Sequence, residues 1–307
     1  MESIGAVELN RKVLRVNLTT GKITTEILDE KDIRDYVGGA GLGGKLLYDE
    51  VKPGIEAFDP ENRLIFTTGL VTGTNVPGTA MINICTKGPL TDLAASCQAN
   101  GFFGLRLKQA GFSTIIIEGK SPEWKYLVVG NGKAELRNAE HLVGKSTFEA
   151  EKMIKDEVGV KRSSAMTIGI GGENLVRYAN VQCDEGHFAA TNGAGAVMGS
   201  KKLKGIIAFG DYRIEPVYPE KLKDSIKEFV KIILQAPPAI GLSKLGTGLL
   251  IPIAYKIGYL PTKNLSEYSW PENKIYDAAV MKKNPAFEFR KNPCYACVVG
   301  HCKNLIF

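Results

Sequence analysis

Val13-Leu-Arg-Val-Asn-Leu18, Thr19-Thr-Gly-Lys22 and Ile23-Thr-Thr-Glu-Ile-Leu28 follow one another near the start of the chain. Apolar and polar residues alternate on both sides of a four-residue segment that contains glycine, which predicts a β-hairpin. Outward from this hairpin, similar short runs separated by glycine predict strands at residues 64–68, 81–86, 114–118, 126–129, 134–136, 164–168, 177–182 and 205–209. The first part of the chain is therefore expected to be dominated by β-sheet.

Helices are expected at fewer places, namely residues 31–37, 43–51, 101–109 and 146–158. After Tyr212 glycine turns become rare, and apolar residues at helical spacing predict helices at 219–234 and 246–257. We therefore place a domain boundary near residue 210, which divides the chain into domains 1–210 and 211–307.

Composition limits the classes of function. The 307 residues are 44% apolar and 23% charged, with a formal charge of +6, which is typical of a folded protein. Basic and acidic residues are interleaved, and no basic run is interrupted by aromatic residues, so no nucleic-acid partner is expected. No segment approaches the ~20 apolar residues of a membrane span, and the start lacks a signal sequence, so we expect a cytoplasmic protein that does not associate with membranes.

The sharpest chemical signal is a group of cysteines near the end of the sequence. Three of the six cysteines fall within nine residues, as Cys294, Cys297 and Cys302. Such clustering favours metal ligation over a disulfide framework, and the spacing suits zinc and an iron–sulfur cluster equally. His301 could complete a zinc site, whereas a cubane cluster normally takes a fourth cysteine; the remaining thiols are Cys85, Cys97 and Cys183, for which a buried inert thiol is the commoner role. Only five residues follow Cys302, which suggests an unfinished domain.

Glycine-rich segments form a second group of candidates. Residues 38–44 precede an expected helix, an arrangement suited either to an anion or to a tight turn, but no βαβ unit surrounds them as a dinucleotide site requires. Residues 193–204 combine small residues with Ser200 and three lysines and suit phosphate or pterin contact, yet lack the ending of a P-loop. For this segment and for residues 98–104, close packing of the backbone is an equally good explanation.

Other catalytic patterns are weak. His187 follows an acidic turn and would serve as a base or ligand, but a solvated or hydrogen-bonded histidine is commoner, and His141 is assigned to the surface. The sequence shows no nucleophilic triad and no paired carboxylates, which leaves the chemistry to a cofactor.

The order of several motifs carries more information than any one of them. Arg15-Val-Asn-Leu-Thr-Thr-Gly21, Tyr36-Val-Gly-Gly39, Thr68-Gly-Leu-Val-Thr-Gly-Thr74 and Thr86-Lys-Gly-Pro-Leu-Thr91 occur in this order. They are followed by Gly169-Ile-Gly-Gly-Glu-Asn174, Gly195-Ala-Val-Met-Gly-Ser-Lys201 and Asn292-Pro-Cys-Tyr-Ala-Cys297. In these motifs, which span nearly the whole chain, the sequence resembles the amino-terminal half of the aldehyde ferredoxin oxidoreductase family.

This resemblance implies an α+β fold, in which a two-sheet β domain forms the base of a pterin-binding saddle and is followed by the start of a mainly helical domain. It implies a tungsten ion held by two pterins, Mg²⁺ between their phosphates, and a 4Fe-4S cluster. The implied reaction oxidises an aldehyde with water to the carboxylate and passes electrons to ferredoxin or another electron carrier. Related tungsten proteins share the fold, so the substrate does not follow from it.

The resemblance also assigns site residues. Segments that match the regions contacting one pterin contain Thr79, Ala80, Met81 and Asn83, and the segment treated as a loop of Gln98, Ala99, Asn100 and Gly101. The segment that matches the region contacting the other pterin contains Ala190, Thr191, Asn192, Gly193 and Gly195. Cys294 and Cys297 match two cluster ligands, and Cys302 is assigned as a third by way of a one-residue bulge.

The sequence departs from the family pattern in three respects. Arginine is common in the family where this chain has Met81 and near Thr191, so Lys87 or Lys201 would have to supply charge for the pterin phosphates. His301 occupies the place of the usual third cysteine. Family chains are about twice as long, so a fourth cluster cysteine and further pterin contacts would come from a carboxyl-terminal half, and a homodimer is a further option.

Two hypotheses follow. The chain is either part of a tungsten-dependent aldehyde oxidoreductase, as a fragment or a split subunit, or a non-catalytic truncated scaffold or electron-transfer subunit that binds only a cluster or zinc. Measurement of tungsten, iron and zinc in the purified chain separates them.

Overall fold

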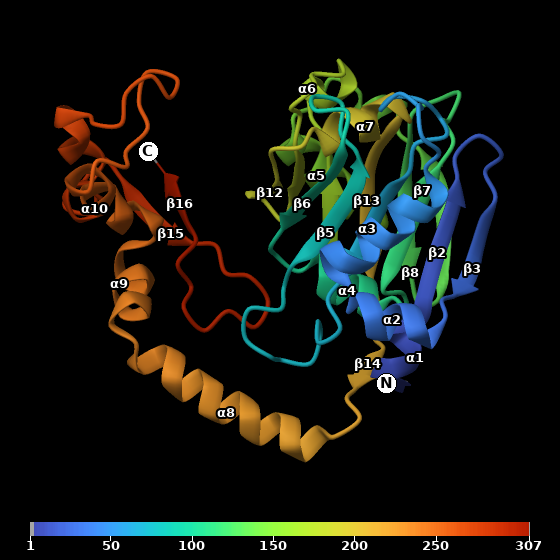
Figure 1. Cartoon of the computed structure of the whole chain (residues 1–307), viewed down its shortest axis with the longest axis horizontal. Helices are drawn as coiled ribbons and strands as arrows, with labels where there is room; N and C mark the ends of the chain where they lie inside the picture. Colours follow the sequence, from blue (N-terminus) through green and yellow to red (C-terminus); the bar gives the residue numbers. More distant parts are fainter. Residues whose placement is uncertain (1–2, 307) are drawn as a thin grey trace. The chain divides into compact units, whose positions relative to one another are not determined.

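The computed structural model describes residues 3–306, which form two compact units that divide between Leu222 and Lys223. The first unit contains two mixed six-stranded sheets (Figure 1). One has the order β3-β2-β7-β4-β5-β6, with β2 at Lys12–Asn17, β3 at Ile23–Ile27, β4 at Leu64–Thr68, β5 at Ile82–Lys87, β6 at Ala94–Ala99 and β7 at Thr114–Glu118. The other has the order β12-β11-β10-β13-β8-β9, with β8 at Lys125–Gly130, β9 at Lys133–Asn138, β10 at Ser163–Thr167, β11 at Val181–Cys183, β12 at His187–Ala189 and β13 at Leu203–Phe209. The α+β fold expected from the sequence is confirmed.

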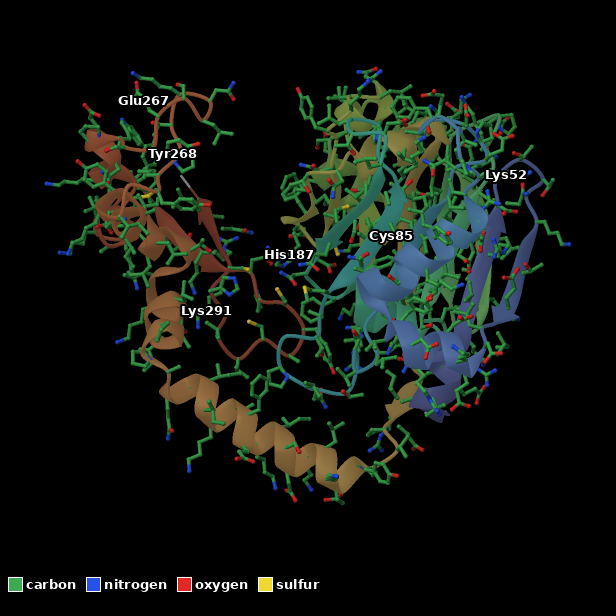
Figure 2. The ribbon with its side chains drawn as sticks, in the orientation of Figure 1. Lys52, Cys85, His187, Glu267, Tyr268 and Lys291 are labelled. Atoms are coloured by element: carbon green, nitrogen blue, oxygen red, sulfur yellow. The ribbon has the colours of Figure 1, made fainter. Side chains whose placement is uncertain are left out.

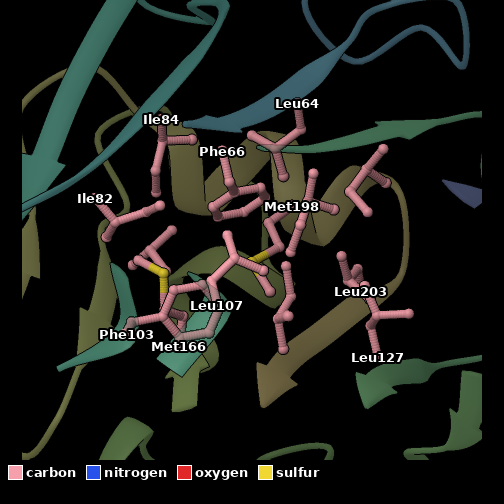
Figure 3. Packing of buried hydrophobic residues seen from close by; sticks show 14 of the residues in the cluster. Leu64, Phe66, Ile82, Ile84, Phe103, Leu107, Leu127, Met166, Met198 and Leu203 are labelled. Carbon is pink, nitrogen blue, oxygen red and sulfur yellow. The ribbon is translucent and has the colours of Figure 1, made fainter. Parts of the chain in front are cut away.

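The main core lies between the inner faces of these sheets. Phe66 and Ile84 from the first sheet pack with Leu127 and Met166 from the second (Figure 3). Two short helices, α4 (Phe103–Gln109) and α7 (Ala194–Ser200), contribute Phe103, Leu107 and Met198 to the same cluster and contact strands of both sheets. The sheets and these helices therefore share one continuous apolar interior, which fixes the positions of the strand ends.

Longer helices cover the outer faces. Helix α3 (Gly39–Glu50) places Leu42, Leu46 and Leu47 on the first sheet, and α5 (Thr147–Val158) places Ile154 on the second. A capping box between Ser146 and Glu149 begins α5, and Gly159 in left-handed conformation ends it. Because α3 lies mainly over β4 and β5, most of the outer face of β6 is left to solvent.

Small elements complete the first unit. β1 (Ser3–Gly5) pairs with β14 (Arg213–Glu215), and between them lie α1 (Ala6–Arg11), α2 (Glu30–Tyr36), α6 (Ile170–Glu173) and the 3-10 helix η1 (Glu140–Leu142). The predicted hairpin is confirmed, since β2 pairs with β3 across Gly21. β8 pairs with β9 in the same way across Asn131 and Gly132, and all three turn residues have positive φ.

Some predicted boundaries were wrong. The helix expected from residue 43 begins at Gly39, so the glycine segment 38–44 forms its cap and first turn. Gln98 and Ala99, treated as loop residues, belong to β6, and the strand expected from residue 177 begins only at Val181.

The second unit is mainly helical and has little interior. It contains most of α8 (Pro219–Gln235), then α9 (Pro237–Leu245), α10 (Leu250–Lys256) and α11 (Ala278–Met281), with 3-10 turns η2 (Thr247–Leu249) and η3 (Pro271–Tyr276). The hairpin β15 (Glu288–Lys291) and β16 (Lys303–Ile306) follows. None of the described side chains of α8, α9 and α10 is buried. No helix between residues 3 and 306 combines the length and hydropathy needed to cross a membrane.

Candidate functional site

The two sheets of the first unit meet at their edge strands, β6 and β12. These strands lie side by side, although the described hydrogen-bond ladders of the two sheets end at them (Figure 1). An edge strand leaves main-chain N–H and C=O groups available for another partner. We call these two strands with their flanking residues, 94–102 and 184–195, the seam.

The outer face of β6 has unusually small side chains. Ala95, Cys97 and Ala99 point into the core, whereas Ala94, Ser96 and Gln98 are exposed. Ser96 is bonded to its neighbour on β5, because Asn83 Nδ2 donates to Ser96 Oγ at 3.0 Å. The result is a flat, uncharged surface on which a planar group could lie.

A direct hydrogen bond crosses the seam. Asn192 Nδ2 donates to the carbonyl oxygen of Ser96 at 2.6 Å. This bond joins the two segments that the sequence assigned to separate pterins, since Gln98 lies two residues after Ser96 and Thr191 precedes Asn192. Thr191 is exposed, with a left-handed φ of 82° that a β-branched residue rarely adopts.

A cavity of about 260 Å³ lies beside this surface. Four predicted site residues line it, Thr79, Met81, Asn83 and Gln98, and so do Gly39, Ala40, Thr67, Gly69, Val71, Thr72 and Gly78. Ala80 and Ala99 are buried behind the surface, and Asn100 is half-buried. The lining side chains can donate and accept hydrogen bonds, but none of them is ionisable.

The glycines after β12 serve close packing. A Cβ atom on Gly193 would lie 2.1 Å from the carbonyl oxygen of Arg177, and one on Gly195 would lie 2.4 Å from that of Asn180. Gly193 also has a φ of 73° as the cap of α7. Close packing therefore explains both glycines, and their contact with a cofactor stays a prediction. Ala190 is half-buried at the end of β12, and its contact with a cofactor also stays a prediction.

The lysines proposed to compensate for missing arginines are engaged elsewhere. Lys201 is fully buried, and its Nζ donates to the carbonyl oxygens of Pro60 and Gly119 at 3.1 and 3.0 Å. Burial lowers the pKa of Lys201 to about 7. Lys87 donates to the carbonyl of Ile55 and pairs with Asp92 at 2.9 Å. The expectation that Lys201 supplies charge to a phosphate is therefore wrong, because its ammonium lies inside the fold.

The neighbouring lysines have similar roles. Lys204 is buried against Glu173, and Lys202 Nζ donates to the carbonyl oxygen of Pro122. The segment 193–204 thus uses its three lysines to hold loops of the first unit, and any anion at this segment would depend on main-chain amides.

Three cysteines of the first unit are interior residues. Cys85 lies between α3 and the first sheet (Figure 2), and a Cβ on Gly43 would approach its Sγ to 2.7 Å. Burial raises the pKa of all three thiols, that of Cys97 to about 12 and that of Cys183 well above its ordinary value. Since a ligating cysteine must be a thiolate, Cys85, Cys97 and Cys183 have the properties of inert core residues.

The cysteine cluster of the second unit occupies one loop. Strands β15 and β16 pair Lys291 with Lys303, and the N–H of Asn292 donates to the carbonyl of Cys302 at 3.0 Å, which closes the loop 292–302. The Sγ atoms of Cys294 and Cys302 lie within 4.8 Å of each other. The extra residue before Cys302 is thus accommodated while the two sulfurs stay close.

Cys297 is held by the turn itself. Its N–H donates to the carbonyl of Cys294 at 3.2 Å, Ala296 has a left-handed φ of 53°, and the N–H of Gly300 donates to Cys297 Sγ at 3.2 Å. An N–H bond to sulfur stabilises a thiolate, so the loop has a donor in place for a metal-bound cysteine. His301 Nε2 lies 3.6 Å from Cys302 Sγ, so a nitrogen donor and a sulfur donor lie next to each other at this end of the loop.

The two remaining histidines differ from each other. His187 is buried on β12 opposite Cys183, whereas His141 is partly exposed and contacts Glu157. The assignment of His141 to the surface agrees with its position.

Sequence reasoning missed Ser96 and Asp184, which connect the two sides of the seam. The sequence around Ser96 gives little indication of a strand, because most residues of Ala94–Ala99 are small and differ little in polarity. For Asp184 the only signal is the sequence Asp-Glu-Gly, which indicates a turn but not its partners.

Comparison with known proteins agrees with the resemblance found in the sequence. The family described as "Aldehyde ferredoxin oxidoreductase, N-terminal domain" matches residues 13–210. The tungsten-containing aldehyde ferredoxin oxidoreductase of Pyrococcus abyssi is 40% identical over 295 residues, covering 94% of this chain and 47% of its own length. The WOR-like subunit of an aliphatic sulfonate oxidoreductase from Pyrococcus furiosus is 37% identical over 238 residues, covering 72% of this chain and 38% of its own.

A solved structure extends the similarity beyond residue 210. The active-site complex BamBC of benzoyl coenzyme A reductase, in complex with 1,5-dienoyl-CoA, superposes with a TM-score of 0.82 at 31% identity. The superposition covers 98% of this chain and 47% of that one. The chain thus spans about half the length of the proteins that it matches.

Proposed function

Because the chain belongs to the aldehyde ferredoxin oxidoreductase family, we propose that it is the amino-terminal, pterin-binding part of a tungsten oxidoreductase. In this proposal an aldehyde is oxidised with water to its carboxylate, and electrons pass through a 4Fe-4S cluster to ferredoxin or another carrier. Curated relatives that contain tungsten, at up to 40% identity along nearly the whole chain, support it.

The seam is the observation that carries the proposal. The edge strands of two sheets, the small outer face of β6 and an adjoining cavity meet in the segments that the family resemblance assigns to the pterins. A pterin is planar and has donors and acceptors along its rim, so a surface of small residues with Asn83, Gln98 and Asn192 suits it. When bound, the metal and its dithiolenes would supply the two-electron chemistry.

The residues of this chain would bind and orient the group. Gln98 and Asn83 would offer amide donors and acceptors to the ring, and Met81, which is 39% exposed, would cover an apolar face. The cavity lining has no charged side chain, so the pterin phosphates would rely on main-chain N–H groups here and on groups outside these residues. Mg²⁺ would take oxygen ligands from the phosphates and from main-chain carbonyls.

Cys294, Cys297 and Cys302 would hold three irons of a cubane cluster. The N–H of Gly300 on Cys297 Sγ would stabilise the reduced cluster, because a hydrogen bond to sulfur offsets added negative charge. The fourth ligand would come from His301 or from polypeptide beyond this sequence, since the thiols of the first unit are buried with raised pKa values.

Elemental analysis combined with an optical spectrum tests the proposal. The chain is purified without oxygen from cells supplied with tungstate, together with any companion polypeptide. Two pterins for each tungsten, together with a broad iron–sulfur absorption, are the expected result. A preparation that contains neither pterin nor iron would contradict it.

The second candidate is a chain that binds only a cluster or zinc. The neutral lining of the cavity and the internal roles of Lys201 and Lys204 favour it, because a doubly phosphorylated group usually meets cationic side chains. Zinc or iron without tungsten and pterin in the same preparation would select this candidate.

A further inference from the structure

A tight turn joins β11 to β12 at the far end of the seam from Asn192. Asp184 and Glu185 have φ values of 44° and 53°, and Gly186 follows with 132°. Two consecutive non-glycine residues in left-handed conformation are uncommon and cost free energy unless their surroundings hold them. The interactions that hold this turn come from three different elements.

The carboxylate of Asp184 accepts hydrogen bonds from both sheets. On the side of the first sheet, the N–H of Phe102 donates to Asp184 Oδ2 at 2.6 Å. On the side of the second sheet, Ser164 Oγ on β10 lies 2.7 and 2.8 Å from the two carboxylate oxygens. The side chain is only 12% exposed, so these bonds compete little with water.

Adjacent groups hold the turn in place. The N–H of Glu185 donates to Glu151 Oε2 at 3.0 Å, and Glu151, buried on α5, also accepts from Gln182 Nε2 and pairs with Lys155. Lys155 Nζ lies 3.8 Å from Asp184 Oδ1, which offsets the negative charge of both carboxylates. The turn is therefore fixed to α5 independently of its bond to Phe102.

The main chain at Gly101 passes close to the carboxylate of Asp184. Its φ is 104°, and a Cβ at this position would lie 2.5 Å from Asp184 Oδ2 and 3.2 Å from Cys183 Sγ. Only glycine allows the main chain to pass so close to Asp184. The loop that leaves β6 is thus positioned by contact as well as by the hydrogen bond to Phe102.

The two cross-sheet bonds bracket the seam. Ser96 is bonded to Asn192, and Phe102 is bonded to Asp184, so advancing along β6 corresponds to going back along β12. The edge strands therefore run antiparallel, held together at both ends, with no ladder between them among the described pairs. Two bonds, one near each end, keep a defined gap between β6 and β12, whereas one bond would let the strands rotate about it.

We propose that Asp184 is a positioning residue, which sets the gap between the segments 98–101 and 190–195 and so fixes the main-chain groups that receive the cofactor. The inference rests on the proposed function, and adds to it a residue that does not itself contact the bound group. Asp184 acts through Phe102 and Gly101 on one side and through β12 on the other.

Paired substitutions separate the hydrogen bond from the backbone conformation. Asp184→Asn keeps an acceptor oxygen and a side chain that tolerates positive φ, whereas Asp184→Gly tolerates positive φ without an acceptor. Asp156→Asn on the exposed side of α5 is the matched control for loss of a carboxylate. All variants are made in the full chain, with any companion polypeptide.

Two readouts are compared. Hydrogen–deuterium exchange reports the Phe102 amide, which should exchange roughly tenfold faster in Asp184→Gly and stay within about twofold of wild type in Asp184→Asn. Tungsten by mass spectrometry and pterin by fluorescence of the oxidised extract report loading, which should fall severalfold in Asp184→Gly and be restored in Asp184→Asn.

The outcomes distinguish this inference from the proposed function. If wild type contains tungsten and pterin and Asp184→Gly contains as much, or if both variants lose the cofactor equally, the positioning role is refuted and the proposed function stands. If wild type itself contains no pterin, the proposed function fails and this role fails with it. Faster exchange throughout the first unit of Asp184→Gly would identify a purely structural residue and also overturn the inference.

Discussion

Lys108 Nζ donates to Asn10 Oδ1 at 2.7 Å, deep inside the first unit. The same ammonium donates to the carbonyl oxygens of Gly69 and Leu70 at 2.8 and 2.9 Å, so α4 is joined to α1 and to the loop that leads into the cavity. All three partners are neutral, and Lys108 is fully buried. The full cost of removing its ammonium group from water therefore applies. Burial lowers its pKa to about 7.

We expect Lys108 to make the free energy of unfolding depend on pH above about 7. The unfolded chain keeps a lysine protonated up to about pH 10.4, whereas the folded chain releases this proton near pH 7, so between these values the unfolded state binds more protons. The contribution of each such lysine to the free energy of unfolding should therefore rise with pH, by up to ~1.4 kcal/mol per pH unit. Lys201, whose pKa is also about 7, contributes in the same direction.

Lys108→Met should remove one of these two contributions. Urea unfolding followed between pH 7 and 8, below the ordinary pKa of the buried thiols, should show a smaller slope in Lys108→Met than in wild type. An unchanged slope would mean that the ammonium of Lys108 is not the titrating group.

Two helical glycines provide a matched test of packing. A Cβ on Gly199 in α7 would lie 1.9 Å from the carbonyl oxygen of Gly172, whereas a Cβ on Gly44 in α3 would meet no atom within 4 Å. Gly199→Ala should therefore destabilise the first unit by about 3 kcal/mol or more, because main chain must move. Gly44→Ala should stabilise it by about 0.4–1 kcal/mol through the unfolded state. Thermal unfolding measures both, and equal effects would contradict the described contact of α6 with α7.

An ion network on the first sheet should make stability sensitive to acid. Arg15 binds Glu50 through two hydrogen bonds of 2.8 Å, and Arg63 Nε adds a third at 3.0 Å. Burial alone would raise the pKa of Glu50, but the bonds from Arg15 and Arg63 outweigh it and lower the pKa. This contribution is present above the ordinary glutamate pKa and is lost as pH falls through the lowered value.

Glu50→Gln should cost about 1–3 kcal/mol at neutral pH and reduce the loss of stability on acidification. Glu8→Gln, at a pair whose carboxylate is 65% exposed, should cost less than about 0.5 kcal/mol. Urea titrations at pH 7 and pH 4 measure both variants, and a Glu50→Gln protein with the wild-type pH dependence would refute the assignment.

Cys297→Ala should abolish the iron content of the purified chain, because it removes one of three thiolates in a single loop. Cys85→Ala is the control, since it removes a buried thiol from the first unit and should lower stability while leaving iron unchanged. Iron per chain by colorimetric assay gives the result. Wild-type iron in Cys297→Ala would remove that residue from the ligand set.

Local patterns predicted much of the fold, and the reasons are physical. The hairpin across Gly21 and the turn at Asn131-Gly132 depend on neighbouring residues alone, so their signals lie within a few positions. β6 was not predicted at all, because Ala94–Ala99 consists mostly of small residues without a strong alternation of hydropathy.

The site was less predictable, because its contacts join distant residues. Lys201 looks like a solvated cation in the sequence, and its burial depends on carbonyl groups of Pro60 and Gly119 that only folding brings near. The bond of Asp184 to Phe102 spans 82 positions, and Asn192 reaches Ser96 across 96. By contrast the cysteine loop 292–302 is local, and its spacing alone was enough to nominate it.

The absence of a described ladder between β6 and β12 also bears on solubility. Open strand edges recruit strands of other molecules, and proteins commonly guard them with charge or cover them. The outer edge strands, β3 and β9, carry charges such as Glu26, Glu135 and Arg137. β6 and β12 have almost none, so each shields the other from foreign strands, and a molecule whose two sheets drifted apart would present both to its neighbours as sites for aggregation.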